Sequence, residues 1–355
     1  MSPVAPLTFA HGPSWRNRLA LAPLTNMQSG SDGVLSDDEY RWLVRRGEGG
    51  FGQVMTCAAY IRDDGHTFPG QLGAAGDQHS EGLTRLAAGI RATGAVSSLQ
   101  LQHGGRRADG ALGAKVGPWD DDAKGVTALT TEGVEQIVAD FAAAAALAER
   151  AGFDGVEIHG AHGYLLAQFL DARNNLRTDR YGGDPENRRR VIVEVIDAVR
   201  AATGPDFQVG LRLSPERYGI PPADAIDLAR QVLADARIDY LDLSLWDAFK
   251  EPADPGFAGR SLLSCFTELP RGDVRLGAAG KIASAADAEA ILGQGTDFVL
   301  IGTGAIIHHD FAARALADPG FVADPQPVTA QRLRDEALGP AFIEYLSTGW
   351  DDFVV

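Results

Sequence analysis

The sequence contains few residues that could cross-link the chain or hold a redox metal. Among its 355 residues only two are cysteine, Cys57 and Cys265, and they lie far apart and outside any CxxC motif. We therefore expect no disulfide framework, no iron–sulfur cluster and no zinc site made of thiolates.

Long apolar runs and targeting signals are missing too. The first residues, MSPVAPLTFAHGPSW, lack a basic start followed by an apolar core, so we expect no signal peptide. The most apolar stretch, FAAAAALA from Phe141, is too short and too closely flanked by charge to span a bilayer. We therefore predict a cytoplasmic protein.

Positive charge is in deficit, which limits the partners. The chain has 32 lysines and arginines against 48 aspartates and glutamates, giving a net charge of −16. Nucleic acids and anionic membranes attract positive surfaces, so we expect neither as a partner. With 45% hydrophobic and 23% charged residues, the composition is typical of a globular protein with a sizeable core.

Short apolar runs alternate with longer helical patterns along the chain. Eight strands are predicted at residues 19–22, 53–57, 96–102, 155–159, 208–214, 240–245, 275–279 and 298–302. Helical patterns cover residues 37–46, 81–93, 132–151, 187–202, 223–236 and 285–292. This β-then-α order predicts an α/β fold, a single (β/α)8 TIM barrel. An inserted loop, residues 107–130, follows the third strand, and its length is typical of a functional segment or a lid.

The C-terminal ends of the strands are where such barrels gather their active sites. In chain order these ends carry Pro23, Leu24 and Thr25; Cys57 and Ala58; Gln100 to His103; His159; Arg212; Trp246; Gly280 and Lys281; and Gly302, Thr303 and Gly304. We expect the functional side chains among them.

The stretch EIHGAHGYLLAQFL, from Glu157, places His159, His162 and Tyr164 at the end of the fourth strand. A metal pair is disfavoured, because the neighbouring strand ends supply neutral or cationic residues such as Arg212 instead of further ligands. Plain core packing is disfavoured as well, since burying the two histidines, the tyrosine and Glu157 without partners would be costly. The stretch therefore predicts a polar working site without a metal.

Three glycine-rich segments need separate interpretations. GEGGFG at residues 47–52 matches GxGxxG but follows a helix and precedes a strand, so it predicts a helix-terminating turn. AAGKI and IGTGAI, which contain Lys281 and Thr303, each follow a predicted strand, where backbone N–H groups frequently bind phosphate. A tight turn would explain either loop alone, but their pairing at strands seven and eight favours phosphate binding.

Arg212 lies inside the apolar segment VGLRLS and needs a partner, because burying an unpaired guanidinium is costly. One alternative is a structural ion pair with Glu157 or Asp242. The other is a fixed positive charge beside a group that becomes anionic. Trp246 could line a pocket, although packing is the commoner role of a tryptophan at a strand end.

Together these segments resemble the Old Yellow Enzyme, or NADH:flavin oxidoreductase, family. The matching stretches are NRLALAPLTNM from Asn17, LQLQHGGR from Leu99, AGFDGVEIHGAHGYLLAQFL from Ala151, NLRTDRYGGDPENRRR from Asn175, VGLRLS from Val209 and GAAGKI from Gly277. They span nearly the whole chain in family order. The resemblance implies one barrel domain over residues 1–355 that binds FMN non-covalently at its C-terminal mouth.

The resemblance also implies which residues contact the cofactor. Ala22, Pro23, Leu24, Thr25 and Ala58 match positions around the flavin ring, Gln100 matches the glutamine at its pyrimidine edge, and Gly280, Lys281, Gly302 and Thr303 fall at the phosphate grip. Arg212 matches the arginine near N1 and O2, where a cation stabilises the reduced flavin.

For the substrate, His159 and His162 match the pair that bonds a carbonyl or nitro oxygen, and Tyr164 matches the proton donor. The implied enzyme is an FMN-dependent ene reductase with NAD(P)H as reductant. Hydride from flavin N5 adds to the β-carbon of an α,β-unsaturated carbonyl or nitro compound, and Tyr164 protonates the α-carbon. The partner is thus a small activated alkene, and one site used in turn by both substrates implies ping-pong kinetics.

Two threonines replace family arginines, and a third lies at a position that differs between family branches. Thr303 replaces an arginine that would bond the phosphate, so we expect weaker FMN binding or compensation by Lys281 or another cation. Thr25 is cysteine in one branch and threonine in another, which should tune the flavin potential. Thr348 replaces the arginine of an Arg-Gly-Trp that in one subgroup reaches a neighbouring subunit. We therefore do not expect a shared active site, and a homo-oligomer is left open.

Two alternatives keep the fold but change the function. A flavin-free isomerase or lyase acting on a phosphorylated metabolite would use Lys281 as a Schiff-base amine or a phosphate contact, with the histidines as acid–base groups. A non-catalytic flavin-binding protein would follow from the missing arginine at Thr303, but the presence of His159, His162 and Tyr164 together speaks against it.

Overall fold

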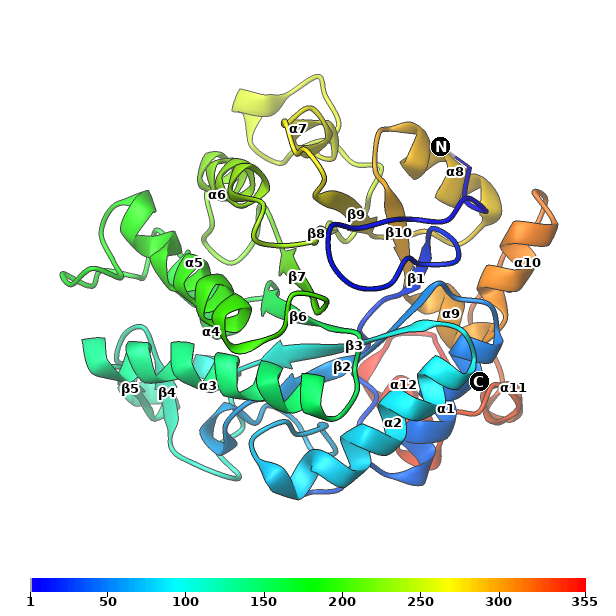
Figure 1. The fold of residues 1–355 in the computed structure, drawn as a ribbon, viewed down its shortest axis with the longest axis horizontal. Helices are drawn as coiled ribbons and strands as arrows, with labels where there is room; N and C mark the ends of the chain where they lie inside the picture. Colours follow the sequence, from blue (N-terminus) through cyan, green and yellow to red (C-terminus); the bar gives the residue numbers. More distant parts are fainter. Residues whose placement is uncertain (1) are drawn as a thin grey trace.

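Eight parallel strands close into a barrel in the computed structural model, which describes residues 2–355 (Figure 1). The barrel strands are β1 (Leu19–Leu21), β2 (Gln53–Tyr60), β3 (Val96–Gln102), β6 (Gly155–Gly160), β7 (Gln208–Leu213), β8 (Tyr240–Ser244), β9 (Arg275–Ala279) and β10 (Phe298–Ile301). They lie side by side in chain order, and β10 pairs with β1 to close the ring. Each coincides with a predicted strand, so the predicted (β/α)8 barrel is confirmed.

Helices surround the barrel (Figure 1). Six coincide with predicted helical patterns: α1 (Asp37–Glu48), α2 (Ser80–Ala92), α3 (Thr131–Arg150), α5 (Pro185–Ala202), α6 (Pro222–Asp235) and α8 (Ala285–Gly293). Six others escaped prediction: α4 (Leu165–Phe169), α7 (Ser264–Thr267), α9 (Thr303–Ile307), α10 (Phe311–Ala317), α11 (Ala330–Asp335) and α12 (Pro340–Gly349). Most of these have too few turns to give a clear periodic pattern. Within residues 2–355, no helix combines the length and apolarity needed to cross a membrane.

The starts of several helices are fixed by side-chain caps. Ser36, Thr130, Asp184 and Ser284 each accept a hydrogen bond from the backbone N–H three residues further on. Such caps satisfy N–H groups that have no partner inside the helix. These caps therefore fix the residue at which each of these helices begins.

The insertion after β3 is folded. It contains the short parallel strands β4 (Lys115–Gly117) and β5 (Val126–Ala128). The guanidinium of Arg106 pairs with Asp121 and stacks 4.3 Å from the ring centroid of Trp119. These contacts hold the insertion near the C-terminal end of β3.

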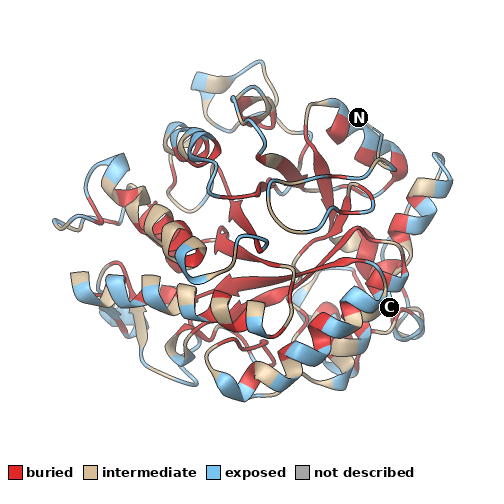
Figure 2. Cartoon of the chain, in the orientation of Figure 1, coloured by how far each residue is buried: buried red, intermediate tan, exposed pale blue. Residues whose placement is uncertain are grey.

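Apolar side chains fill the space between strands and helices (Figure 2). Strands β2, β3 and β6 are buried along their whole length, as expected for a parallel sheet covered on both faces. The buried colour in Figure 2 follows the strands and the inward faces of the helices.

Aromatic side chains close the N-terminal end of the barrel. The first residues run across this end, where Leu7 and Trp15 pair antiparallel (Figure 1). The fully buried Trp15 packs edge-to-face on Phe298 and Tyr240, with ring centroids 4.9 Å and 5.7 Å away. Because this end is filled, the carboxyl ends of the strands are left for binding.

Replacing Trp15 by alanine should destabilise the protein by about 3–5 kcal/mol, because it leaves a cavity among close-packed rings. Urea denaturation followed by circular dichroism measures this loss. Leu176 is 76% exposed, so the control Leu176→Ala should change the free energy of unfolding by less than about 0.5 kcal/mol. Equal losses in the two variants would contradict a packed role for Trp15.

Candidate active site

A cavity of about 600 Å³ lies at the carboxyl ends of the barrel strands. Of the predicted site residues, its lining contains Ala22, Pro23, Leu24, Thr25, His162, Tyr164, Arg212, Gly280, Lys281, Gly302 and Thr303. These residues lie at or just after strands that are far apart in the sequence. The structure therefore brings together most of the residues predicted from strand ends.

Three predicted residues, Ala58, Gln100 and His159, are buried and do not line this cavity. Ala58 and Gln100 are partners in register on β2 and β3. Gln100 donates from Nε2 to Oε1 of Glu157 at 2.7 Å. His159 contacts the lining through His162, whose Nδ1 lies 3.3 Å from Nε2 of His159.

The cavity also contains residues that the sequence did not identify. Arg107, Tyr218, Ser244, Tyr345 and Trp350 line it. Trp246, for which packing was the commoner alternative, lines the cavity as well and is 52% exposed. Tyr345 lies in α12 and Trp350 directly follows it, so no pattern at a strand end could mark either residue.

Four lining residues have a left-handed backbone. His162, Tyr218, Trp246 and Lys281 have φ angles of 59°, 62°, 64° and 52°. Side chains with a Cβ avoid this region at a cost of about 1–2 kcal/mol per residue. Strained residues that gather around one cavity are typical of a functional site.

Hydrogen bonds link Arg212 to the two histidines. Nη2 of Arg212 donates to Oγ of Ser244 at 3.3 Å, and this oxygen lies 2.8 Å from Nε2 of His162. Since Arg212 can only donate, the serine proton is free to donate to His162. When the hydrogen bonds run in this direction, His162 donates from Nδ1 to Nε2 of His159. The proton of His159 is then on its Nδ1. That Nδ1 is buried and has no partner within residues 2–355.

Both imidazoles are kept neutral. Burial, followed by the positive charges of Arg212 and Arg107, lowers the pKa of His162 to about 3. Burial also lowers the pKa of His159, and the neighbouring His162 and Arg212 act in the same direction. Each neutral ring keeps one N–H donor and one acceptor nitrogen.

Arg212 is a fixed positive charge inside the barrel. Its Nε lies 3.2 Å from Oδ2 of Asp242, while its Nη1 is buried without a partner within residues 2–355. Burial raises the pKa of Asp242 to about 6, against the opposing effect of Arg212. Burial and the nearby Asp242 raise the pKa of Glu157 to about 8. At neutral pH the ion pair is therefore Arg212–Asp242, Glu157 is uncharged, and one edge of the guanidinium is free.

Tyr164 precedes α4 and contacts a second cation. The guanidinium carbon of Arg107 lies 4.7 Å from the centroid of the Tyr164 ring, and Arg107 donates to the carbonyl of His162. Burial raises the pKa of Tyr164, and Arg107 opposes this rise. The hydroxyl therefore holds its proton at neutral pH, with a positive charge beside it that would stabilise a phenolate.

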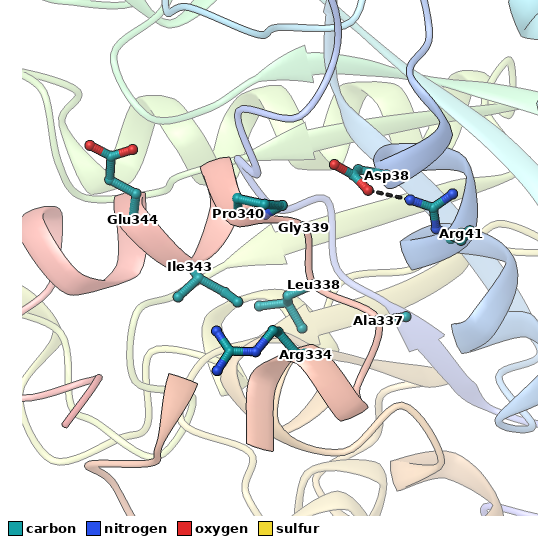
Figure 3. A pocket seen from close by; sticks show the side chains of 9 residues that line it. All are labelled: Asp38, Arg41, Arg334, Ala337, Leu338, Gly339, Pro340, Ile343 and Glu344. Atoms are coloured by element: carbon teal, nitrogen blue, oxygen red, sulfur yellow. Dashed lines mark hydrogen bonds and ion pairs between the residues drawn. The ribbon is translucent and has the colours of Figure 1, made fainter. Parts of the chain in front are cut away.

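A separate hollow between α1 and α12 has none of these features (Figure 3). Two of its charged side chains, Asp38 and Arg41, pair with each other, Arg334 and Glu344 also line it, and Leu338, Pro340 and Ile343 form an apolar wall. It shares no lining residue with the cavity at the strand ends. We therefore assign the candidate active site to the strand-end cavity.

Comparison with known proteins decides the family. The model of the NADH:flavin oxidoreductase / NADH oxidase family matches residues 4–318. The chain belongs to this family. As a member, it is an NAD(P)H-dependent flavin oxidoreductase whose cofactor is FMN.

Relatives within the NADH:flavin oxidoreductase family cover most of the chain. A probable NADH-dependent flavin oxidoreductase of Bacillus subtilis strain 168 is 38% identical over 309 residues, which are 84% of this chain and 83% of that protein. An NADPH dehydrogenase of the same organism is 32% identical over 326 residues, 89% of this chain and 95% of that protein.

Solved structures of the family share the fold. Morphinone reductase in complex with tetrahydroNAD has a TM-score of 0.79 at 26% identity, with 99% of each chain covered. Old Yellow Enzyme from Pichia sp. AKU4542 has a TM-score of 0.78 at 26% identity, covering 95% of this chain and 92% of that one.

The residues of the cavity fit FMN. The unpartnered Nη1 of Arg212 offers a donor to the flavin ring. A Cβ at Gly302 would meet only a Leu24 methyl at 3.8 Å, so this loop leaves room for a ligand. Nζ of Lys281 lies 3.0 Å from Oδ2 of Asp247, so part of its charge is already neutralised.

We predict that neither His159 nor His162 titrates between pH 8 and pH 5, because burial and the adjacent guanidinium groups disfavour the imidazolium. Nitrogen chemical shifts of ¹⁵N-histidine protein, assigned with His159→Gln and His162→Gln variants, measure this. A protonation midpoint above pH 5 for either ring would contradict the prediction.

Proposed function

We propose that the chain is an FMN-dependent ene reductase that reduces the C=C bond of an α,β-unsaturated carbonyl or nitro compound. The observation that carries this proposal is the meeting of neutral His162 and protonated Tyr164 in the cavity that Arg212 also lines, with a second neutral imidazole, that of His159, bonded behind His162. These groups supply hydrogen-bond donors for an oxygen and a proton for carbon, which is what alkene reduction requires of the protein.

Several chain residues hold the cofactor in this proposal. Ala22, Pro23, Leu24, Thr25 and Ala58 surround the flavin ring, Gln100 bonds its pyrimidine edge, and Gly280, Lys281, Gly302 and Thr303 hold its phosphate. Arg212 would help to hold FMN through its unpartnered Nη1, and its fixed positive charge would stabilise the negative charge that the flavin gains on reduction. When bound, FMN supplies the redox chemistry by taking hydride from NAD(P)H and returning it to the β-carbon of the alkene.

His159 and His162 bind the carbonyl or nitro oxygen of the substrate. Hydrogen bonds to this oxygen lower the cost of the negative charge that develops there. The Nδ1–H of His159 is buried and has no partner within residues 2–355, so this ring must turn toward the cavity to donate to the substrate. His162 joins it by exchanging its bond to His159 for one to the substrate.

Tyr164 protonates the α-carbon. An unperturbed tyrosine has a pKa of about 10, and burial raises the pKa of Tyr164, so the proton is present at neutral pH. Arg107 stabilises the phenolate that remains, because its guanidinium stacks on the same ring. Tyr164 thus releases its proton when the substrate gains carbanion character.

One cavity serves the reductant and the alkene in turn. Trp246, Tyr218, Tyr345 and Trp350 give it apolar surface on which a nicotinamide or an alkene can lie. A flavin-free enzyme with a Schiff base on Lys281 has less support, because this side chain is 71% exposed and paired with Asp247, whereas amine nucleophiles are commonly activated by burial or by a second cation.

The variant Tyr164→Phe tests the proton donor. We expect the reduction of 2-cyclohexenone by pre-reduced protein to slow by about 10²–10⁴-fold, the usual contribution of a general acid. Loss of flavin absorbance under anaerobic NADPH should keep its rate, because that step takes no proton from Tyr164. Stopped-flow spectroscopy measures both half-reactions separately.

The matched control is Tyr345→Phe, which removes another hydroxyl from the same cavity and should slow the alkene step far less. Alkene reduction by Tyr164→Phe at the wild-type rate would refute the assignment of Tyr164. Purified protein that is colourless and takes up no FMN on titration would refute the proposed function as a whole.

A further inference from the structure

Three arginines near the mouth of the cavity have no acidic partner. Arg107, Arg173 and Arg217 are exposed, and none forms an ion pair with a carboxylate within residues 2–355. The chain has a net charge of −16, and most of its other arginines pair with aspartate or glutamate. Exposed guanidinium groups that lack such a partner are therefore unexpected next to an active site.

Two of them are held in place by aromatic rings of the cavity wall. The guanidinium carbon of Arg107 lies 4.7 Å from the centroid of the Tyr164 ring. That of Arg217 lies 4.3 Å from the centroid of the Trp246 ring. Stacking uses the face of a guanidinium and leaves the N–H groups in its plane for hydrogen bonds. Arg107 uses its Nη1 to donate to the carbonyl of His162, and its other N–H groups remain for an anion.

Neighbouring hollows connect the three arginines. A hollow of about 310 Å³ is lined by Arg107 and Arg173, and another of about 750 Å³ is lined by Arg173 and Arg217. Tyr218 lines both hollows and the active-site cavity. The three guanidinium groups thus border two adjoining hollows, here called the depression, which share Tyr218 with the active-site cavity.

Most other charged side chains near this depression are paired with an opposite charge, but Asp171 and Asp254 accept hydrogen bonds only from neutral groups within residues 2–355. Arg106 pairs with Asp121, and Lys250 pairs with Glu216. Asp171 accepts three hydrogen bonds, from the backbone of Arg173 and from the backbone and side chain of Asn174. Asp254 accepts the backbone N–H of Gly256, and Lys124 lies 4.0 Å from Asp121.

We propose that Arg107, Arg173 and Arg217 form an anion subsite that binds a carboxylate or phosphate of the molecule whose reactive part occupies the cavity. A cationic depression on an acidic protein focuses the electrostatic potential and draws anions to this entrance. The anion belongs either to the alkene, as a carboxylate, or to the reductant, as the phosphates of NAD(P)H. The inference rests on the proposed function, because it concerns ligands of the same cavity.

Binding to the oxidised holoenzyme, with no turnover, tests the alkene as the source of the anion. Isothermal titration calorimetry compares trans-4-oxo-2-pentenoate with its neutral methyl ester. In Arg173→Ala/Arg217→Ala, the Kd of the acid relative to that of the ester should rise about five- to tenfold, the size expected of two exposed charge contacts. Arg173→Lys/Arg217→Lys should recover part of this loss.

Flavin reduction tests the reductant as the source. Stopped-flow absorbance compares NADPH with 1-benzyl-1,4-dihydronicotinamide, which has no phosphate. If the subsite binds nucleotide phosphate, the double alanine variant should raise the half-saturating concentration of NADPH about five- to tenfold relative to that of the benzyl compound. Both effects should weaken as the salt concentration rises.

The control Arg150→Ala removes the same charge from α3, where Arg150 lies 3.8 Å from Asp77, and should change neither ratio. The subsite is supported if the double alanine variant, but not Arg150→Ala, changes the acid-to-ester Kd ratio or the NADPH-to-benzyl ratio of half-saturating concentrations. The ratio that changes identifies the ligand. If neither ratio changes, the subsite is wrong, even where the wild type reduces the ester. If the ratios change but no alkene is reduced, the subsite stands and the proposed function fails.

Discussion

Burial of one guanidinium, that of Arg212, is the constraint on which the site depends. Its charge requires a buried anion, which Asp242 supplies. Burial and the negative charge of Asp242 disfavour a second charge on Glu157, and its pKa rises to about 8. On the other side, the same positive charge helps to keep His159 and His162 neutral. Burial is the largest cause of the pKa shifts of these two carboxyl groups and two imidazoles, and the charge of Arg212 acts on all four.

The register of the barrel makes this arrangement possible. His159, Arg212 and Asp242 are direct partners on the adjacent strands β6, β7 and β8. Side chains in register on parallel strands point to the same face of the sheet. The opposite end of the barrel, filled by the rings around Trp15, keeps water away from the buried charges. Packing at one end therefore supports the electrostatics at the other.

Much of this could be predicted from the sequence, because barrel topology converts a position at the end of a strand into a position in space. That rule found His162, Tyr164, Arg212 and the glycine loops without any knowledge of distances. It could not find Tyr345 or Trp350, which reach the cavity only through the packing of α12. It also could not show that Asp247 pairs with Lys281, or that Ser244 joins Arg212 to His162. Such contacts depend on side-chain directions that no spacing encodes.

The left-handed backbone at His162, Tyr218, Trp246 and Lys281 has a consequence for the behaviour of the protein on heating. Unfavourable conformations are concentrated at one end of the molecule, while the strands and the aromatic rings at the other end are closely packed. Regions of low local stability open before the whole structure does. A rise in temperature should therefore loosen the mouth and release the cofactor before the strands separate, so that loss of colour precedes loss of fold.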